Sequence, residues 1–313
     1  MALTSTGAGA GNAVGALVEA MNACTPLLHL TGQVEKAWLD ADTGFIHETR
    51  DQLSFLKASS KRAYRISNAN QAIAILHKAI QDAQTPPCGP VSVEIPIDIQ
   101  SANIPLSLVT APMKPTSVAT VDPAIVDALW AQLKQAKQPL LWLGGGALRS
   151  ADAVKKLADA GITVISSTHA RGVLPDSHRG SLRAFHNSPS VEALIAQCDF
   201  TLVAGSRLRS NETRSWTLAL PSPRVQVDID PAAASRNYLM DNTLIADCSA
   251  LLSALADNVQ GREWGNAQWD ALVQQAVEQA GQGLRDQCGP YARLNDAIEK
   301  ALPQDGLLVR DIT

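Results

Sequence analysis

Short apolar runs separated by polar stretches organise the first third of the chain. Residues 27–32 read Leu-Leu-His-Leu-Thr-Gly, a run without alternation that ends in glycine and is typical of a buried parallel strand. Residues 91–95 form a second such run, and apolar positions recur at helical spacing over 69–84. Buried strands on either side of a helix predict an α/β layer structure. We also expect an alanine-rich helix ending near Ala23 and irregular structure over 33–61.

A proline-rich stretch without periodicity, residues 100–121, predicts a linker to a second set of elements. Asp122 and Pro123 then supply a helix cap and a first helical residue. Beyond them buried strands again alternate with helices, followed by an exposed connecting helix, one further helix and a last strand. The predicted helices are 122–137, 150–160, 189–197, one starting at 247, 261–285 and 292–301, and the predicted strands are 139–143, 162–165, 200–204, 224–230, 244–245 and 307–309.

Composition narrows the class of protein. The chain has 313 residues, of which 46% are apolar and 18% charged, and this suits a folded chain of roughly two domains. A net charge of −4 provides no electrostatic footprint for nucleic acid or an anionic membrane, so we expect neither as a partner. Lys61, Arg62 and Arg65 are the densest basic cluster, and we expect them to form a solvated face.

Five cysteines lie far apart and lack Cys-x-x-Cys spacing, which predicts reduced thiols and no zinc site. The first residues do not read as a secretory signal, and no apolar run approaches the roughly 18 residues of a membrane span. We therefore expect a cytoplasmic protein.

Glycine-rich turns are the first candidates for a ligand site. Gly7, Gly9 and Gly11 precede the alanine-rich helix, where uncovered amide groups favour anions and a ligand can approach the backbone. Their spacing matches neither the dinucleotide fingerprint nor a phosphate loop. A tightly packed helix start would explain the same glycines, so both interpretations stay open.

A second group of turns follows the strands of the later set. Gly144–Gly146, Gly205 and Asp228–Pro231 each come directly after a predicted strand, at the edge where doubly wound sheets bind ligands. Three such turns indicate a crevice of dinucleotide size. Tight strand-to-helix connections alone would also require glycine there, and the sequence does not decide between the two.

Histidines offer one further candidate. His29 lies inside an apolar strand, so we expect a core side chain with satisfied hydrogen bonds. His47 lies in a loop beside Glu48 and is the better site candidate. The chain has no His-x-x-x-His spacing and no Gly-x-Ser-x-Gly turn, so a hydrolase triad has no support.

Several segments carry a family resemblance through their order and spacing. Residues 4–12, the small-residue helix after them and Thr31-Gly32-Gln33 form one group, and 89–99 reads Gly-Pro-Val-Ser-Val-Glu-Ile-Pro-Ile-Asp-Ile. Together with 143–147, 172–178, 204–207, 227–231 and 302–311, they resemble thiamine diphosphate-dependent enzymes of the acetolactate synthase, benzoylformate decarboxylase and pyruvate oxidase group. The resemblance covers essentially the whole chain.

The resemblance implies an α/β fold with doubly wound parallel sheets, in which a complete central Rossmann-like domain is flanked by partial thiamine diphosphate-binding domains. It implies 2-oxo acid decarboxylation or carboligation, with thiamine diphosphate and Mg²⁺ as cofactors and a homodimer or homotetramer as assembly. The family's catalytic glutamate and Gly-Asp-Gly metal motif are absent from these residues, so we expect this chain to be inactive alone. The implied segments are a partial pyrimidine-binding domain at 1–100, linkers at 101–121 and 261–290, the central domain at 122–260 and the start of the diphosphate-binding domain at 291–313.

Site residues carry over position by position. Gln33 ends the Thr-Gly-Gln segment and is implied to face substrate, and His47 stands near a position where the family often has glutamine. Gly7, Gly9 and Asn12 are implied to wall the thiamine site. A non-catalytic module that binds FAD or NAD, or that mediates oligomerisation, is the alternative. In flavin-containing members the central domain binds FAD, and the matching positions here are Gly144, Gly145, Gly205, Arg207, Asp228, Ile229 and Asp247.

Overall fold

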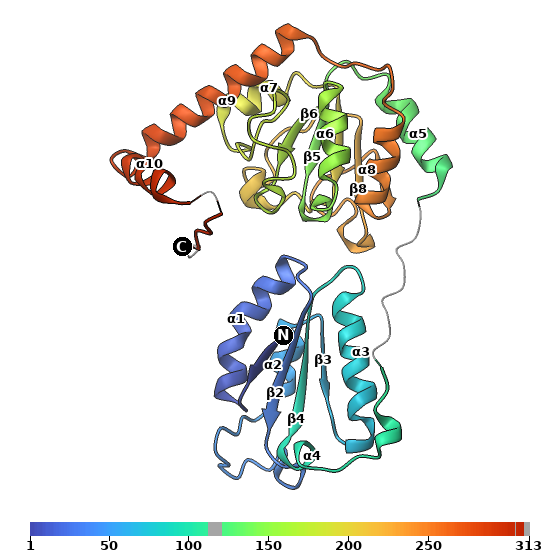
Figure 1. The fold of residues 1–313 in the computed structure, drawn as a ribbon, viewed down its shortest axis with the longest axis vertical. Helices are drawn as coiled ribbons and strands as arrows, with labels where there is room; N and C mark the ends of the chain where they lie inside the picture. The colour runs from blue at the N-terminus through green and yellow to red at the C-terminus, as the bar shows by residue number, and fades with distance from the viewer. Residues whose placement is uncertain (112–120, 304, 310–313) are drawn as a thin grey trace. The chain divides into compact units, whose positions relative to one another are not determined.

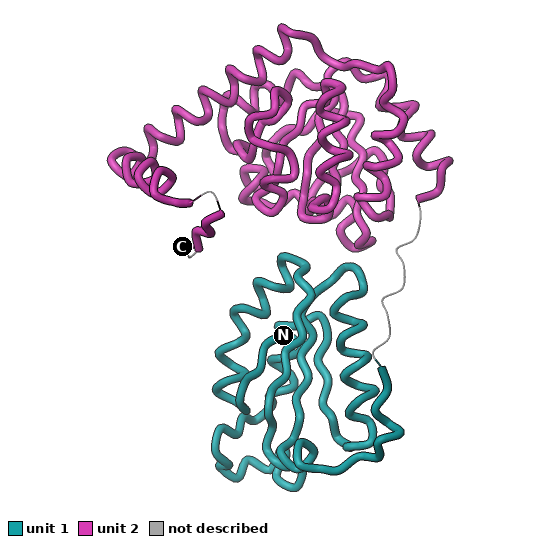
Figure 2. The backbone as a smooth tube through the Cα atoms, in the orientation of Figure 1, with its two compact units in different colours: residues 1–118 teal, residues 119–313 magenta. Residues whose placement is uncertain are grey.

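The structure, a computed structural model, describes residues 1–111, 121–303 and 305–309. The chain divides into two compact units, residues 1–118 and 119–313 (Figure 2). Each unit contains one parallel sheet with helices packed on it (Figure 1). The predicted α/β class with doubly wound parallel sheets is therefore confirmed, whereas the finer division into five segments stays a prediction.

Unit 1 is built on a four-stranded sheet in the order β1-β2-β4-β3, and all neighbouring strands are parallel. Parallel neighbours need crossover connections, which the helices supply. The strands and helices predicted for this part of the chain are all present. The elements are β1 (Ala2–Thr4), α1 (Ala8–Asn22), β2 (Leu27–Gln33), α2 (Gln52–Ser59), β3 (Arg62–Arg65), α3 (Ala72–Gln84), β4 (Pro90–Pro96) and α4 (Ile97–Gln100).

The two faces of this sheet differ in chemistry because side chains alternate along each strand. Val91 and Val93 of β4 point to one face, where they pack with Leu28 against α3. Ser92 and Glu94 point to the other face, which α2 covers, since Gln52 contacts Glu94 there. This polar face is buried, so its groups depend on hydrogen bonds within the protein.

Unit 2 contains a five-stranded parallel sheet in the order β6-β5-β7-β8-β9. The strand order reverses between β5 and β7, which is where doubly wound sheets bind ligands. Asp122 accepts a hydrogen bond from Ala124 N ahead of Pro123, which confirms the predicted start of the first helix. The elements are α5 (Pro123–Leu133), β5 (Pro139–Leu143), α6 (Ala151–Asp159), β6 (Thr163–Ser166), α7 (Pro189–Ile195), β7 (Phe200–Ala204), β8 (Arg224–Asp228), β9 (Asn242–Ile245), α8 (Cys248–Asp257), α9 (Ala267–Cys288) and α10 (Tyr291–Ala301).

Helices cover both faces of the unit 2 sheet. Helices α5, α6 and α8 pack on the face that contains Leu141 and Leu143 of β5. Helices α7 and α9 pack on the opposite face with Leu140 and Trp142. Because successive residues of β5 enter opposite cores, the strand is apolar throughout, as its sequence pattern predicts.

Several predictions of local structure are wrong. Residues 307–309 were expected to form a strand, but they belong to no strand in the structure. Residues 33–61 were expected to be irregular, but they contain α2. The pattern also misses β1 and β3, which are short edge strands without an apolar run. Pairing with the longer strands β2 and β4, rather than local sequence, decides that these residues are extended.

The expectation of an exposed helix over 261–285 is also wrong. Trp269, Val273 and Val277 of α9 are buried in the core beside α7, and the Trp269 indole N–H donates to Thr163 Oγ1 at 2.8 Å. These apolar residues are spaced three or four apart among glutamines, so the helix has a polar average despite one apolar face. Helix α9 is therefore part of the core of unit 2.

Candidate functional site

The turn between β1 and α1 brings two predicted site residues together. Gly7 has a φ of +55°, a region that residues with a side chain rarely adopt. A Cβ on Gly7 would lie 1.9 Å from the carbonyl oxygen of His47, so only glycine fits here. The contact involves the backbone of His47, and His47 is an exposed residue. Gly7 thus serves close packing, which is one of the two interpretations its sequence left open.

Thr49 lies against the same turn. Its methyl carbon would be 3.2 Å from a Cβ on Gly7, and its hydroxyl is buried with no hydrogen-bond partner among the described residues. A buried hydroxyl without a partner is uncommon in proteins and is destabilising. A polar group of a ligand, or a water molecule, beside the Gly7 turn would satisfy it.

The first turn of α1 is the accessible part of the predicted thiamine wall. It contains no acidic residue, so no carboxylate of its own neutralises the positive end of the helix dipole. A Cβ on Gly11 would meet nothing within 4 Å, and Asn12 is exposed. Gly9 differs, because its Cβ would lie 2.4 Å from Ser5 Oγ. A Cβ on Gly9 would therefore require the Ser5 hydroxyl to move, whereas Gly11 and Asn12 border open space.

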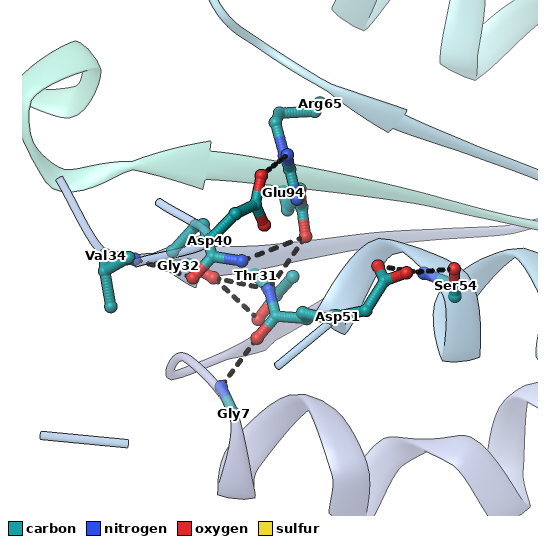
Figure 3. Close-up of polar contacts among 11 residues, drawn as sticks. Gly7, Thr31, Gly32, Val34, Asp40, Asp51, Ser54, Arg65 and Glu94 are labelled. Atoms are coloured by element: carbon teal, nitrogen blue, oxygen red, sulfur yellow. Dashed lines mark hydrogen bonds and ion pairs between the residues drawn. The ribbon is translucent and has the colours of Figure 1, made fainter. Parts of the chain in front are cut away.

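Gln52 connects the Gly7 turn to two strands, through hydrogen bonds to Gly7, Gly32 and Glu94. Figure 3 labels these three partners and marks the contacts as dashed lines. Its Oε1 accepts a hydrogen bond from Gly7 N at 2.6 Å. Its Nε2 donates to Gly32 O at 2.9 Å and to Glu94 Oε2 at 3.1 Å. Gln52 and Glu94 are both 0% exposed, so these hydrogen bonds are buried. The amide of Gly7 is therefore occupied by the protein itself.

Gln33, expected to face substrate, is buried at the end of β2. Its Oε1 accepts a hydrogen bond from Val34 N at 2.7 Å, and its Nε2 donates to Glu94 Oε2 at 3.4 Å. Both ends of the carboxamide therefore have protein partners. The longer of the two bonds, to Glu94, is the one that a competing acceptor would replace.

Arg65 provides the counter-charge for Glu94. Its Nε pairs with Glu94 Oε1, and its Nη1 lies 3.8 Å from Asp40 Oδ2. Arg65 is register partner of Glu94 in the β3–β4 pair, which sets the two side chains next to one another. The expected solvated face of Lys61, Arg62 and Arg65 is therefore wrong for Arg65, and also for Lys61, which donates to two backbone carbonyls.

In unit 2 the predicted glycine turns pack on one another at the point where the strand order reverses. Gly144 N donates to Ala204 O at 2.8 Å, and Gly146 N donates to Gly205 O at 3.1 Å. A Cβ on Gly144 would lie 2.1 Å from Gly205 O, and Gly205 has a φ of +61°. A Cβ on Gly145 would have room, with its nearest neighbour 3.6 Å away. Close approach of two backbones explains Gly144 and Gly205, while Gly145 remains accessible.

Charged groups line the same edge after β8 and before α8. Asp228 accepts a hydrogen bond from Asp230 N at 2.9 Å, and burial raises the pKa of its carboxyl group. Arg207 Nη2 lies 3.8 Å from Asp230 Oδ2. Asp247 caps α8 by accepting from Ala250 N at 2.9 Å, as the sequence predicts. Three of the positions predicted for a nucleotide, Arg207, Asp228 and Asp247, therefore have structural partners within the protein.

His29 is a core residue, as expected. It is 0% exposed, and its ring nitrogens lie 2.9 Å from Thr4 Oγ1 and 3.0 Å from Ser92 Oγ. Burial lowers the pKa of His29, so the neutral ring is favoured. Among the residues that the structure describes, no cluster of three or more histidine, cysteine, aspartate or glutamate side chains is arranged to hold a metal ion. No helix in the same part of the chain is long and apolar enough to cross a membrane.

Comparisons with known proteins match both units. The family model for the thiamine pyrophosphate enzyme N-terminal TPP binding domain matches residues 1–55, and that for the central domain matches residues 126–255. The chain is 25% identical over 317 residues to the acetolactate synthase isozyme 1 large subunit of Escherichia coli strain K12, covering 99% of this chain and 55% of that protein. It is 26% identical over 261 residues to an acetolactate synthase of Mycobacterium bovis, covering 81% and 42%. It is 26% identical over 317 residues to a probable 2-ketoarginine decarboxylase of Pseudomonas aeruginosa, covering 98% and 55%.

The chain belongs to the thiamine diphosphate-dependent enzyme family, which confirms the resemblance of its motifs. One matched segment contains the Gly7 turn and Gln33, and the other contains Gly144, Gly205 and Asp228. The chain spans about half the length of the curated relatives it matches.

Gln52, Arg65 and Glu94 form the part of the site that sequence reasoning misses. Glu94 carries a signal, because a charged residue inside an otherwise apolar strand must have a buried partner. Gln52 and Arg65 carry none, since they follow a polar stretch without periodicity. Only the pairing of β3 with β4 and the packing of α2 bring these three side chains together.

Proposed function

We propose that this chain is part of a thiamine diphosphate-dependent enzyme that decarboxylates a 2-oxo acid or joins two carbonyl compounds, as the name acetolactate synthase describes for its relatives. The observation that carries the proposal is the similarity to an acetolactate synthase over 99% of the chain, through both units. The Gly7 turn follows β1 and Gln33 ends β2, and the carboxyl ends of these strands meet at one edge of the unit 1 sheet because the strands are parallel.

The residues around the Gly7 turn fit such a cofactor. Gly11 and Asn12 border open space, and the Thr49 hydroxyl is buried without a partner among the described residues. In this proposal Gly7, Gly9 and Asn12 form part of the wall against the thiamine ring. When bound with Mg²⁺, thiamine diphosphate supplies a carbon nucleophile and accepts the electron pair released as carbon dioxide leaves.

Two side chains of this chain are proposed to act on the substrate. Gln33 would turn its Nε2 from Glu94, 3.4 Å away, to a keto oxygen, where a neutral amide donor stabilises developing negative charge. His47, exposed beside the Gly7 turn, would carry a proton to or from the substrate.

Activity assays test this proposal. We propose that the 313 residues alone do not turn over 2-oxo acids, because they contain no Gly-Asp-Gly sequence for Mg²⁺ and diphosphate. The assay compares the purified 313-residue chain with the full product of its gene, each with thiamine diphosphate and Mg²⁺, and measures carbon dioxide released from pyruvate and other 2-oxo acids. Turnover by the 313 residues would contradict the proposal that they are inactive alone. If the gene product released carbon dioxide from no 2-oxo acid, the proposed function would be wrong.

FAD binding is a finer proposal for unit 2. The observation in its favour is the position of Gly145, Arg207 and Asp228 at the edge where the strand order reverses. The packing of Gly144 on Gly205 favours the alternative that these glycines serve the turns alone. A flavin absorbance band in the purified protein supports nucleotide binding, and its absence after addition of FAD and dialysis contradicts it.

We also propose a homodimer or homotetramer that works in the cytoplasm. The assembly follows from membership of the family, because the resemblance implies sites formed between subunits. The location follows from the five widely spaced cysteines, which lack Cys-x-x-Cys spacing. Light scattering on the purified gene product measures the assembly, and a monomer at all concentrations tested would contradict it.

A further inference from the structure

The polar network beneath the Gly7 turn contains more members than the proposed chemistry uses. We infer that Glu94 and Gln52 are positioning residues: the Glu94 carboxylate orients the Gln52 carboxamide, and Gln52 holds Gly7 and with it the wall of the thiamine site. The role of this wall in cofactor binding rests on the proposed function. The hydrogen bond between Gln52 and Gly7 does not depend on the proposed function, and its effect can be measured without a cofactor.

The contacts of Gln52 permit one orientation of its carboxamide. Gly7 N is a donor, so the group that faces it at 2.6 Å must be the amide oxygen. Gly32 O and the Glu94 carboxylate are acceptors, so the group that faces them must be the NH₂. A flipped amide would set donor against donor and acceptor against acceptors. Gln52 therefore delivers its oxygen to Gly7 only while its NH₂ is held on the other side.

Glu94 holds that NH₂ and orients a second carboxamide in the same way. Its Oε2 accepts from Gln52 and from Gln33, whose oxygen in turn accepts from Val34 N. Its Oε1 pairs with Arg65. Three donors from β2, α2 and β3 therefore converge on one fully buried carboxylate of β4.

A carboxylate is required at this position because both of its ends face donors. A glutamine there would have one oxygen and one NH₂. With its oxygen toward Arg65, this glutamine would direct its NH₂ at the NH₂ groups of Gln52 and Gln33. In the reverse orientation, its NH₂ would face the guanidinium of Arg65. Charge-assisted hydrogen bonds to a paired, buried carboxylate are also stronger than neutral ones. Glu94→Gln is therefore nearly identical in shape and yet incompatible with the network.

The network acts on Gly7, whose backbone conformation is restricted by its surroundings. Gly7 has a φ of +55° and lies against the His47 carbonyl, and the N-terminus of α1 has no side-chain cap. The hydrogen bond from Gly7 N to Gln52 thus substitutes for a cap and fixes the direction in which α1 leaves the turn. Displacing Gln52 would move the accessible start of α1, from Ala8 to Asn12.

Amide hydrogen exchange of the 313-residue chain, measured residue by residue by NMR, tests the inference. Gln52→Met keeps the length of the side chain and removes both hydrogen-bonding groups. We expect exchange of the Gly7 amide to accelerate about tenfold, which corresponds to one lost hydrogen bond. Gln100→Met is the control for the loss of another glutamine side-chain hydrogen bond in unit 1, because Gln100 Nε2 donates to the carbonyl of Ile95 at 2.7 Å.

Glu94→Gln is the second variant and should raise exchange at Gly7 as Gln52→Met does, without any change to Gln52 itself. Unchanged Gly7 exchange in Gln52→Met would overturn the inference. Equal acceleration throughout α3 would also overturn it, since it would indicate general loss of stability. Calorimetric titration with thiamine diphosphate and Mg²⁺ is the separate arm: if wild type binds, Gln52→Met should bind more weakly, and if wild type does not bind, the proposed cofactor role fails while Gly7 exchange still decides the positioning.

Discussion

The carbonyl oxygen of His47 lies 1.9 Å from the position that a Cβ on Gly7 would take, so the two could not both fit. Both residues have positive φ values, +55° and +60°. The loop that follows β2 and the turn that precedes α1 therefore meet through backbone atoms, and each keeps the other in an uncommon conformation.

Gly7→Ala should destabilise the chain by about 2–4 kcal/mol, because the new methyl group adds a steric clash to an unfavourable φ. Urea denaturation followed by circular dichroism measures the change. Gly15→Ala is the control within the same helix: a Cβ there meets nothing within 4 Å, and alanine should stabilise the helix by about 0.5–1 kcal/mol. Equal effects of both substitutions would contradict the close contact at Gly7.

Stability should fall as the pH falls below about 6.5, in part because of His29. Burial lowers the pKa of His29 in the folded chain below its ordinary value of 6.5, so below that pH the unfolded chain binds a proton that the folded chain does not. His186 shifts in the same direction through its own burial, so wild type alone does not separate the two.

His29→Gln isolates the contribution of His29. At about pH 8 the variant should be less stable by about 1–2 kcal/mol, since the imidazole bonds to Thr4 and Ser92 are lost. At about pH 5 the difference from wild type should shrink, because glutamine takes up no proton. Urea unfolding at both pH values measures it, and a difference that stays constant with pH would refute a depressed pKa at His29.

Trp269→Ala should reduce the stability of unit 2 by about 3–5 kcal/mol, because a large side chain leaves the core and the Thr163 hydroxyl loses its partner. Leu284→Ala on the same helix is the control, since Leu284 is 52% exposed and its loss should change stability by about 0.5 kcal/mol or less. Hydrogen exchange in β5 and β7 reports on the unit 2 core directly. If both variants leave that exchange unchanged, α9 is a connection and not part of the core.

Gly205→Ala should destabilise unit 2 by about 2–4 kcal/mol, since a Cβ there would lie 2.5 Å from Gly146 Cα and the φ is +61°. Gly172→Ala separates the two causes. Gly172 also has a positive φ, +85°, but its Cβ would meet nothing within 4 Å, so alanine should cost only about 1–2 kcal/mol. Thermal unfolding of the two variants compares them, and similar losses would show that backbone strain alone matters at Gly205.

Sequence patterns predicted the longer elements correctly. The apolar runs at 27–32, 91–95 and 139–143 favour strands buried on both faces, and each is found in the middle of a parallel sheet. The cap of α5 by Asp122 and that of α8 by Asp247 also follow from local chemistry. These predictions succeed because their physical causes act within a few residues.

The sequence by itself therefore determined the α/β class, the family and the turns that carry candidate ligand residues. It did not determine the edge strands β1 and β3, the buried face of α9 or the Glu94 network. Arg65 and Glu94 are 29 residues apart, and Gln52 and Glu94 are 42 apart. Strand pairing and helix packing decide such contacts, since a hydrogen bond between distant residues depends on where the whole backbone places its donor and acceptor.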